Sequence, residues 1–174
     1  MRRVSLNQRI ANDSASTEEI YAALFFIDHS SLAKPIRLST DNTERLSSDP
    51  LYYGTRSTWM TGNPIADPFL WIVASTLLPS DMDDAPAAAT IIIENVDNEI
   101  AKLLRSFTDL ATMHIAVVLA SSPNMIEVEY RDLKIVSHDL NPGEVTLQVS
   151  RQDVEEEDYP VDRMTKDKFP GLHR

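Results

Sequence analysis

The sequence of 174 residues contains no cysteine and only 4 glycines. The absence of cysteine excludes disulfides, thiolate nucleophiles and cysteine-ligated zinc or iron–sulfur sites. The few glycines form no phosphate-cradling loop, and the sequence has no Gly-x-Ser-x-Gly nucleophile elbow. Several common kinds of enzyme are therefore excluded by composition and motif alone.

Runs of basic residues and long apolar runs are also missing. The 16 Lys and Arg residues against 27 Asp and Glu residues give a formal net charge of -11, whereas a nucleic-acid binder needs a basic surface. The longest apolar stretches fall well short of the roughly 20 residues that span a bilayer. After Arg2 and Arg3, the polar stretch Ser5–Ser16 stands where a signal peptide would need an apolar core. We therefore expect no sequence-specific nucleic-acid partner, no membrane segment and no standard secretion signal.

The remaining composition is that of one globular domain with a tail. Hydrophobic residues make up 43% and charged residues 25% of the chain, both ordinary values. A chain of this size can bury roughly 70% of the surface that its unfolded state exposes. We expect one β-rich domain over residues 1–151. Residues 152–174, with the acidic run Glu155–Asp158, are expected to form an extended C-terminal tail.

Short apolar runs between turn signals predict a mostly antiparallel β structure. Pro35–Ser39 is expected at an edge of the sheet, because a proline is tolerated there. Asn141-Pro142-Gly143 is a strong turn signal between the last two strands. The predicted strands are Ile20–Ile27, Pro35–Ser39, Phe69–Leu78, Ala88–Ile93, His114–Ala120, Ile126–Val136 and Glu144–Val149.

One clear helix is predicted between two of these strands. Asp97 or Asn98 is suited to cap its first turn, and the helix is expected to end near Ala111. The residues with helical spacing are Ile100, Leu103, Leu104, Phe107, and Leu110 or Ala111. Leu6–Ala15 could add a short helical segment. The expected fold class is mainly β with one flanking α-helix.

The polar segment Thr40–Pro68, interrupted by glycine and proline, predicts a long loop or extended arm with at most a weak strand. It carries Tyr52, Tyr53 and Trp59. These aromatic residues could contact a partner or stack on a sugar, because tyrosine and tryptophan are enriched at interfaces. Alternatively, they fold back as a small satellite core. The sequence leaves both interpretations open.

No residue pattern identifies a metal, cofactor or catalytic site. The acidic run Asp81–Asp84 has the ligand type that calcium prefers, but a solvated acidic loop is favoured because it lacks the glycine and distal glutamate of the helix-loop-helix motif. The histidines show no metal-ligand spacing, and they are His29, His114, His138 and His173.

His29 lies beside Asp28, but neighbouring strand residues point to opposite faces, so a turn-capping or packing role is favoured. No local signature selects the two carboxylates, roughly 5 to 9 Å apart, that glycoside hydrolysis needs. We expect no enzymatic activity and no cofactor.

Several short motifs, in order along the chain, resemble a family of tailed-bacteriophage minor tail proteins catalogued as a domain of unknown function. The most specific is the stretch Ile93–Ile100, similar to the family's Ile-Asp-Asn-Val-Asp-Arg-Glu-Ile entry into a helix, although Asn98 stands where a basic residue is commoner. The other motifs are Glu19–Tyr21, Ile27–Leu32, Leu77–Pro79 with the acidic run that follows, and Phe169–Leu172.

The resemblance implies a structural subunit of the phage tail tip or baseplate, near the hub and tape-measure proteins. It implies a tail-tube-like β-sandwich or barrel that assembles into a trimeric or hexameric ring, with the tail-tube, hub and tape-measure proteins as neighbours. It further implies a location in the virion tail, and in the host cytoplasm during assembly. The genome could pass through such a ring, where acidic residues would repel its phosphates.

A ring subunit must contact like copies and other tail proteins, and strand edges, arms and termini can do so without disturbing a core. We therefore expect the arm at residues 40–68 and the C-terminal tail to become ordered on assembly. The expected assembly contacts are Tyr52, Tyr53, Trp59, Phe169 and Leu172. The alternatives are a carbohydrate- or receptor-binding tail module and, less favoured, a peptidoglycan hydrolase.

Overall fold

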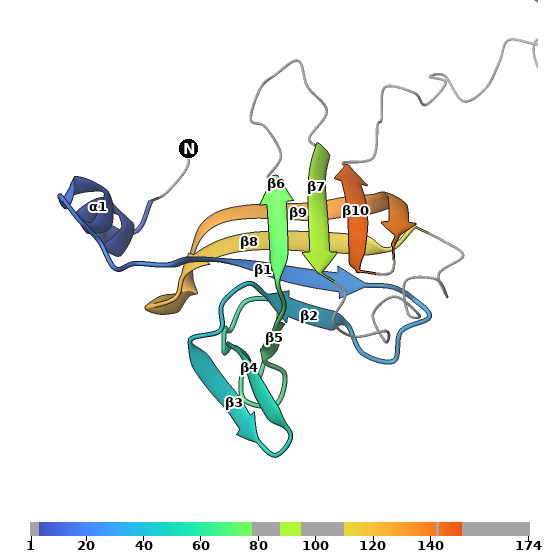
Figure 1. Ribbon diagram of the computed structural model, residues 1–174, viewed down its shortest axis with the longest axis horizontal. Coiled ribbons are helices and arrows are strands. Elements are labelled where there is room, and N and C mark those ends of the chain that lie inside the picture. The colour runs from blue at the N-terminus through green and yellow to red at the C-terminus, as the bar shows by residue number, and fades with distance from the viewer. Residues whose placement is uncertain (1–3, 78–87, 95–109, 142, 151–174) are drawn as a thin grey trace, which may run out of the picture.

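The computed structural model describes residues 4–77, 88–94, 110–141 and 143–150 (Figure 1). This part of the chain contains one short helix and ten strands, and the ten strands form a single sheet. The predicted fold class, mainly β with one helix, is confirmed. The described helix is α1 (Leu6–Asp13), in the segment Leu6–Ala15 for which a short helical segment was considered possible. Most of the helix predicted from Asp97 lies outside the described residues. Its expected last residues, Leu110 and Ala111, are described, are not helical and lead into a strand.

The strands follow the order β3-β4-β5-β2-β1-β8-β9-β10-β7-β6 across the sheet. Every neighbouring pair is antiparallel except β2 and β5, which are parallel. The bounds are β1 Tyr21–Asp28, β2 Ile36–Ser39, β3 Glu44–Ser48, β4 Leu51–Thr55, β5 Phe69–Trp71, β6 Ala74–Leu77, β7 Ala88–Glu94, β8 Thr112–Leu119, β9 Ser122–Leu140 and β10 Glu144–Ser150.

Two strand predictions need correction. The segment Pro35–Ser39 was expected at an edge, but β2 lies inside the sheet between β1 and β5. The run Phe69–Leu78 was expected to form one strand, but β5 and β6 lie in opposite halves of the sheet. Between them, Ile72 N donates to Ser39 O (2.8 Å) and Val73 O accepts from Glu94 N (2.9 Å). The chain thus changes halves within one apolar run, which hydropathy alone cannot reveal.

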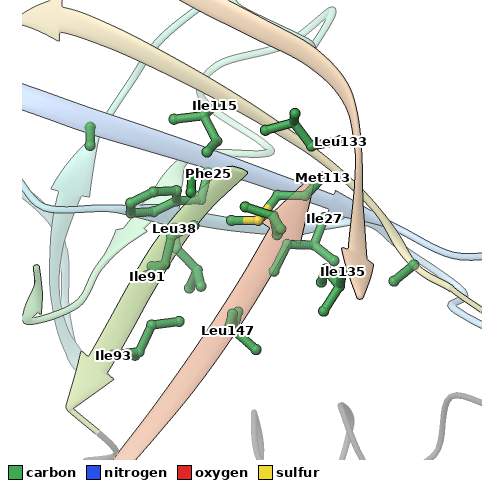
Figure 2. Close-up of a cluster of buried hydrophobic side chains, with 14 of the residues drawn as sticks. Phe25, Ile27, Leu38, Ile91, Ile93, Met113, Ile115, Leu133, Ile135 and Leu147 are labelled. Atoms are coloured by element: carbon green, nitrogen blue, oxygen red, sulfur yellow. The ribbon is translucent and has the colours of Figure 1, made fainter. Parts of the chain in front are cut away.

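The sheet bends over itself along β9, which is 19 residues long and pairs first with β8 and then with β10. In Figure 1, the strands β6, β7 and β10 cross over β1, β8 and β9. The main core lies between these two parts of the sheet (Figure 2). Its largest fully buried side chains are Phe25, Ile27, Ile91, Ile93, Met113, Ile115, Leu133 and Leu147.

A second core covers the other face of β1 and β8. In β1, Phe25 and Ile27 belong to the main core, while Leu24 and Phe26 belong to the second, because successive strand side chains point to opposite faces. The six central residues of β1 are consequently all buried. Burial on both faces explains why this strand is a continuous apolar run.

Candidate functional site

The segment Thr40–Pro68, expected to be a long loop or extended arm with at most a weak strand, contains the hairpin of β3 and β4, which extends the sheet through β4–β5 pairing. In Figure 1 this hairpin projects away from the main core. The prediction of a long loop was wrong because three of the buried positions at its base, Asp41, Gly54 and Thr55, are not hydrophobic. The usual alternation of apolar and polar residues is therefore absent.

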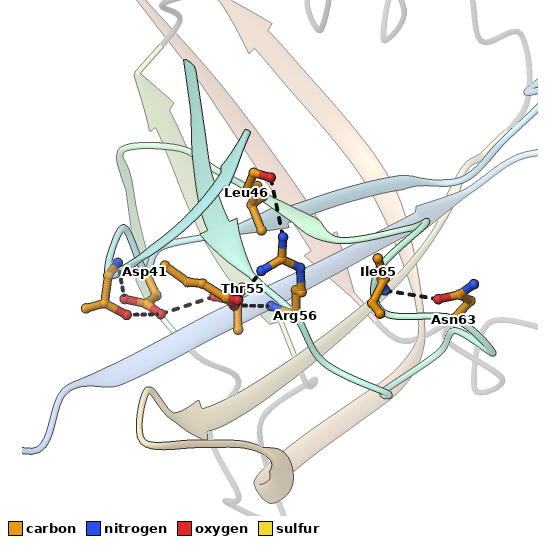
Figure 3. Close-up of polar contacts among 8 residues, drawn as sticks. Asp41, Leu46, Thr55, Arg56, Asn63 and Ile65 are labelled. Atoms are coloured by element: carbon orange, nitrogen blue, oxygen red, sulfur yellow. Dashed lines mark hydrogen bonds and ion pairs between the residues drawn. The ribbon is translucent and has the colours of Figure 1, made fainter. Parts of the chain in front are cut away.

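A buried polar network fixes the base of this hairpin (Figure 3). The hydroxyl oxygens of Ser39 and Thr55 lie 2.7 Å apart, and Thr55 Oγ1 donates to Asp41 Oδ2 at 3.3 Å. The same carboxylate accepts from Thr43 through both its backbone N–H (2.9 Å) and its hydroxyl (2.9 Å). These bonds join residues before β3 to the end of β4, so the hairpin leaves the sheet at a fixed position.

Arg56 adds a second connection just after β4. Its guanidinium pairs with the carboxylate of Glu44, and its Nη2 donates to Leu46 O at 3.3 Å (Figure 3). Gly54 is needed nearby, since a Cβ at this position would overlap the backbone oxygen of Phe69 in β5.

Trp59, expected either to contact a partner or to join a satellite core, lies in the interior at 5% exposure. Its ring stacks on Phe69 with centroids 5.8 Å apart, and meets the edge of Phe26. Its Nε1 donates to Glu129 Oε1 at 2.7 Å, where Arg131 Nε also donates at 2.7 Å. The structure therefore places Trp59 in the second core and not on a contact surface.

Burial raises the pKa of Glu129, but the hydrogen bonds from Trp59 and Arg131 outweigh this effect. The net result is a pKa below the ordinary carboxyl value, so the charged form is favoured in the fold. Glu129 thus supports Trp59 as a structural anchor, with its Oε1 shared between Trp59 and Arg131.

The other two aromatic residues of the hairpin are exposed. Tyr52 and Tyr53 directly precede Gly54, which pairs with Leu70 of β5 across the strands. Leu51 and Tyr53 point to one face and Tyr52 to the other, by strand alternation. We call these exposed side chains the hairpin patch, and its members, which are 37% to 55% exposed, are Leu51, Tyr52, Tyr53, Leu70 and Trp71. The expected contacts Phe169 and Leu172 lie outside the described residues.

Two histidines, His29 and His114, have structural partners. His29 Nδ1 lies 2.6 Å from Ser31 Oγ and accepts from Ser31 N at 3.1 Å, which agrees with the expected turn-capping or packing role. His114 is buried against the Phe26 ring, with centroids 5.9 Å apart, and its Nδ1 accepts from Asp132 N at 3.1 Å. Sequence reasoning gave no role to His114, because its partners come from other strands.

The described residues contain no cluster of three or more potential metal ligands. The acidic run Asp81–Asp84 lies outside them. Across the same described ranges, no helix is long and apolar enough to cross a membrane.

An open groove of about 580 Å³ lies beside α1. At one side of it, the Ser121 hydroxyl lies 2.8 Å from a carboxylate oxygen of Glu19, to which it donates. The lining residues are Asn7, Ile10, Ala11, Ser14, Ser16, Thr17, Glu18, Glu19, Ile20, Thr43, Ala120 and Ser121. This lining mixes hydroxyl, carboxylate and aliphatic groups.

The hairpin patch is therefore the candidate functional site, and its chemistry is that of a contact surface. Tyrosine and tryptophan side chains provide large contact area with few rotatable bonds, a property that suits binding. No protein-family model matches the chain, and no curated protein matches it.

Proposed function

We propose that this protein is a non-enzymatic structural subunit of a bacteriophage tail tip or baseplate. It works by binding other copies of itself and neighbouring tail proteins in a ring. The order of short motifs along the sequence supports the phage assignment, and the mainly β fold is compatible with it. The hairpin patch is the observation that carries the proposed mode of action.

Three features suit the hairpin patch to assembly. It brings together Leu51, Tyr52 and Tyr53 of the projecting hairpin with Leu70 and Trp71 of the neighbouring strand β5, and all five side chains are exposed. The network around Asp41 and Thr55 holds this hairpin in place before any partner binds. A contact surface that is already ordered loses less conformational entropy on association. The expectation that residues 40–68 become ordered only on assembly is thus replaced, because β3 and β4 are formed in the single chain.

The ends of the sheet offer a second means of contact. Among the described strands, β3 and β6 are the outermost, so each has one neighbour instead of two. An outermost strand can pair with a strand of another molecule through backbone hydrogen bonds. The outermost strand β3 belongs to the same hairpin as Tyr52 and Tyr53, so apolar contact and strand pairing could act at one interface.

The proposal is tested by measuring oligomeric state with light scattering and negative-stain electron microscopy. The double variant Tyr52→Ser, Tyr53→Ser should remain folded and lose ring formation, because both side chains are exposed. Tyr21→Ser is the matched control, since Tyr21 is 47% exposed but lies in β1 beside α1. Rings formed equally well by the double variant would refute the role of the hairpin patch. Absence of the protein from purified virions would refute the phage assignment.

A carbohydrate-binding tail module is the second candidate, because exposed tyrosine and tryptophan side chains also stack on sugars. Glycan retention that disappears in the double variant, together with a strictly monomeric protein, would favour this candidate. A clearing zone on peptidoglycan would instead indicate a hydrolase and overturn the non-enzymatic assignment.

A further inference from the structure

The bend of β9 contains a bulge whose extra residue is bound by a histidine. Met113 pairs with Leu133 and Ile115 pairs with Tyr130, so the single residue His114 lies opposite both Arg131 and Asp132. Asp132 has φ 58, a left-handed conformation that non-glycine residues adopt rarely. A bulge leaves backbone groups without ladder partners, and here the imidazole Nδ1 of His114 accepts from Asp132 N at 3.1 Å.

This bulge lies next to the place where β9 changes partners. Lys134 pairs with Thr112 of β8 and also with Ser150 of β10. The strand therefore leaves one part of the sheet and joins the other within two residues of Asp132. The flanking residues Leu133 and Ile135 both point into the main core. The conformation at Asp132 thus helps to set how the two parts of the sheet enclose the core.

The hydrogen bond depends on the protonation state of the imidazole. In the neutral ring Nδ1 can accept a hydrogen bond, whereas in the imidazolium both nitrogens are donors. A proton on Nδ1 would therefore place two N–H groups against each other. The His114 side chain is also buried beside Phe26, where a positive charge is poorly solvated.

The charged groups around His114 come from β1 and β9. Burial lowers the pKa of His114 below its ordinary value of 6.5, and Arg131 lowers it further. The carboxylates of Asp132, Asp28 and Glu129 act in the opposite direction without cancelling this effect. The neutral, hydrogen-bonded form is therefore the form that the fold favours.

We infer that His114 and Asp132 form a pH-sensitive latch at the bend of β9. At neutral pH the latch is closed by the bond from Asp132 N to His114 Nδ1. At acidic pH, protonation of His114 opens the bulge and loosens the contact between the two parts of the sheet. This device goes beyond the proposed assembly role, because it concerns the shape of the subunit and not its contact surface.

Amide hydrogen exchange measured by NMR on the full-length protein tests the latch. The protection factor, corrected for the intrinsic pH dependence of exchange, should fall for Asp132 and Leu133 as the pH drops below 6.5. Because opening takes up one proton, the fall should approach about tenfold per pH unit until the folded-state pKa is reached. The amide of Phe25 in β1 is the reference and should lose less protection at each pH.

The variant His114→Asn separates titration from packing. The Asn Oδ1 can accept from Asp132 N but does not titrate, so protection at Asp132 should no longer depend on pH. His29→Asn, at a second buried histidine, should leave the wild-type behaviour unchanged. A wild-type Asp132 amide whose protection does not change between pH 7.5 and pH 5 would overturn the inference, even if His114→Asn failed to fold. Persistent pH dependence in a folded His114→Asn variant would overturn it equally.

Discussion

Trp59 gives the sharpest test of how the segment after the hairpin is held, because its indole N–H donates to one carboxylate oxygen 70 residues away in sequence. The variant Trp59→Phe keeps an aromatic ring between Phe26 and Phe69 but removes this donor. A hydrogen bond to a charged group contributes about 1.5 to 3 kcal/mol. The Glu129 side chain is 28% exposed, so water can partly replace the lost donor. We therefore expect a loss of about 1.5 kcal/mol, the lower end of that range.

Urea unfolding followed by tryptophan fluorescence and circular dichroism measures this loss, and Trp71 keeps a fluorescent reporter in the variant. The single variant Glu129→Gln and the double variant complete a mutant cycle. If the bond between Trp59 and Glu129 carries the effect, Trp59→Phe should cost less in the Glu129→Gln background. Equal costs in both backgrounds would refute the hydrogen-bond explanation and leave only the change in packing.

The pKa of Glu129 provides an independent check with a defined sign. Its folded-state pKa is lowered, so the stabilisation is present above the unfolded-state value of about 4.5. That stabilisation is lost as the pH falls through the lower, folded-state pKa. In Trp59→Phe one of the hydrogen bonds that lower the pKa is gone. The dependence of unfolding free energy on pH in the acid range should therefore be weaker in the variant than in the wild type.

Two further predictions concern the hairpin base. Gly54→Ala should disrupt β4–β5 pairing, because the new Cβ would overlap the Phe69 oxygen, and loss of amide protection in β4 with β1 unchanged would show it. Full wild-type stability of Gly54→Ala would contradict the close approach of these strands. Thr55→Val keeps the shape but removes the hydroxyl that binds Asp41, and should cost about 1 to 3 kcal/mol in thermal or urea unfolding. Thr58→Val is its control, since Thr58 is exposed, and a Thr55→Val loss no larger than that of the control would show the network to be unimportant.

The elements that could be predicted from the sequence are those whose buried side chains are apolar. The strands β1, β7, β8 and β10 contain short apolar or alternating runs with turn residues beside them, and each was expected close to its observed place. The same local signals identified the turn at His29 and the mainly β class. These features depend on neighbours along the chain, so local pattern is enough to predict them.

The hairpin, the burial of Trp59 and the role of His114 could not be predicted, because each depends on contacts between residues far apart in the sequence. The hairpin base is buried through hydroxyl groups and Asp41, which resemble loop residues until Ser39 and Thr55 come together. Trp59 could have faced a partner or a core, and only its packing on Phe69 decided between them. His114 acquires its role from the extra backbone N–H of a bulge in another strand.

By itself, the sequence determined that this protein is mainly β, acidic and free of cysteine chemistry. Only the tertiary structure decided that one sheet bends over itself, that Tyr52 and Tyr53 are exposed while Trp59 is buried, and that His114 holds the bend. The physical reason is that alternation and apolar runs report what each residue does beside its neighbours. Which residues share a core, a bulge or a surface is set by strand pairings between distant parts of the chain.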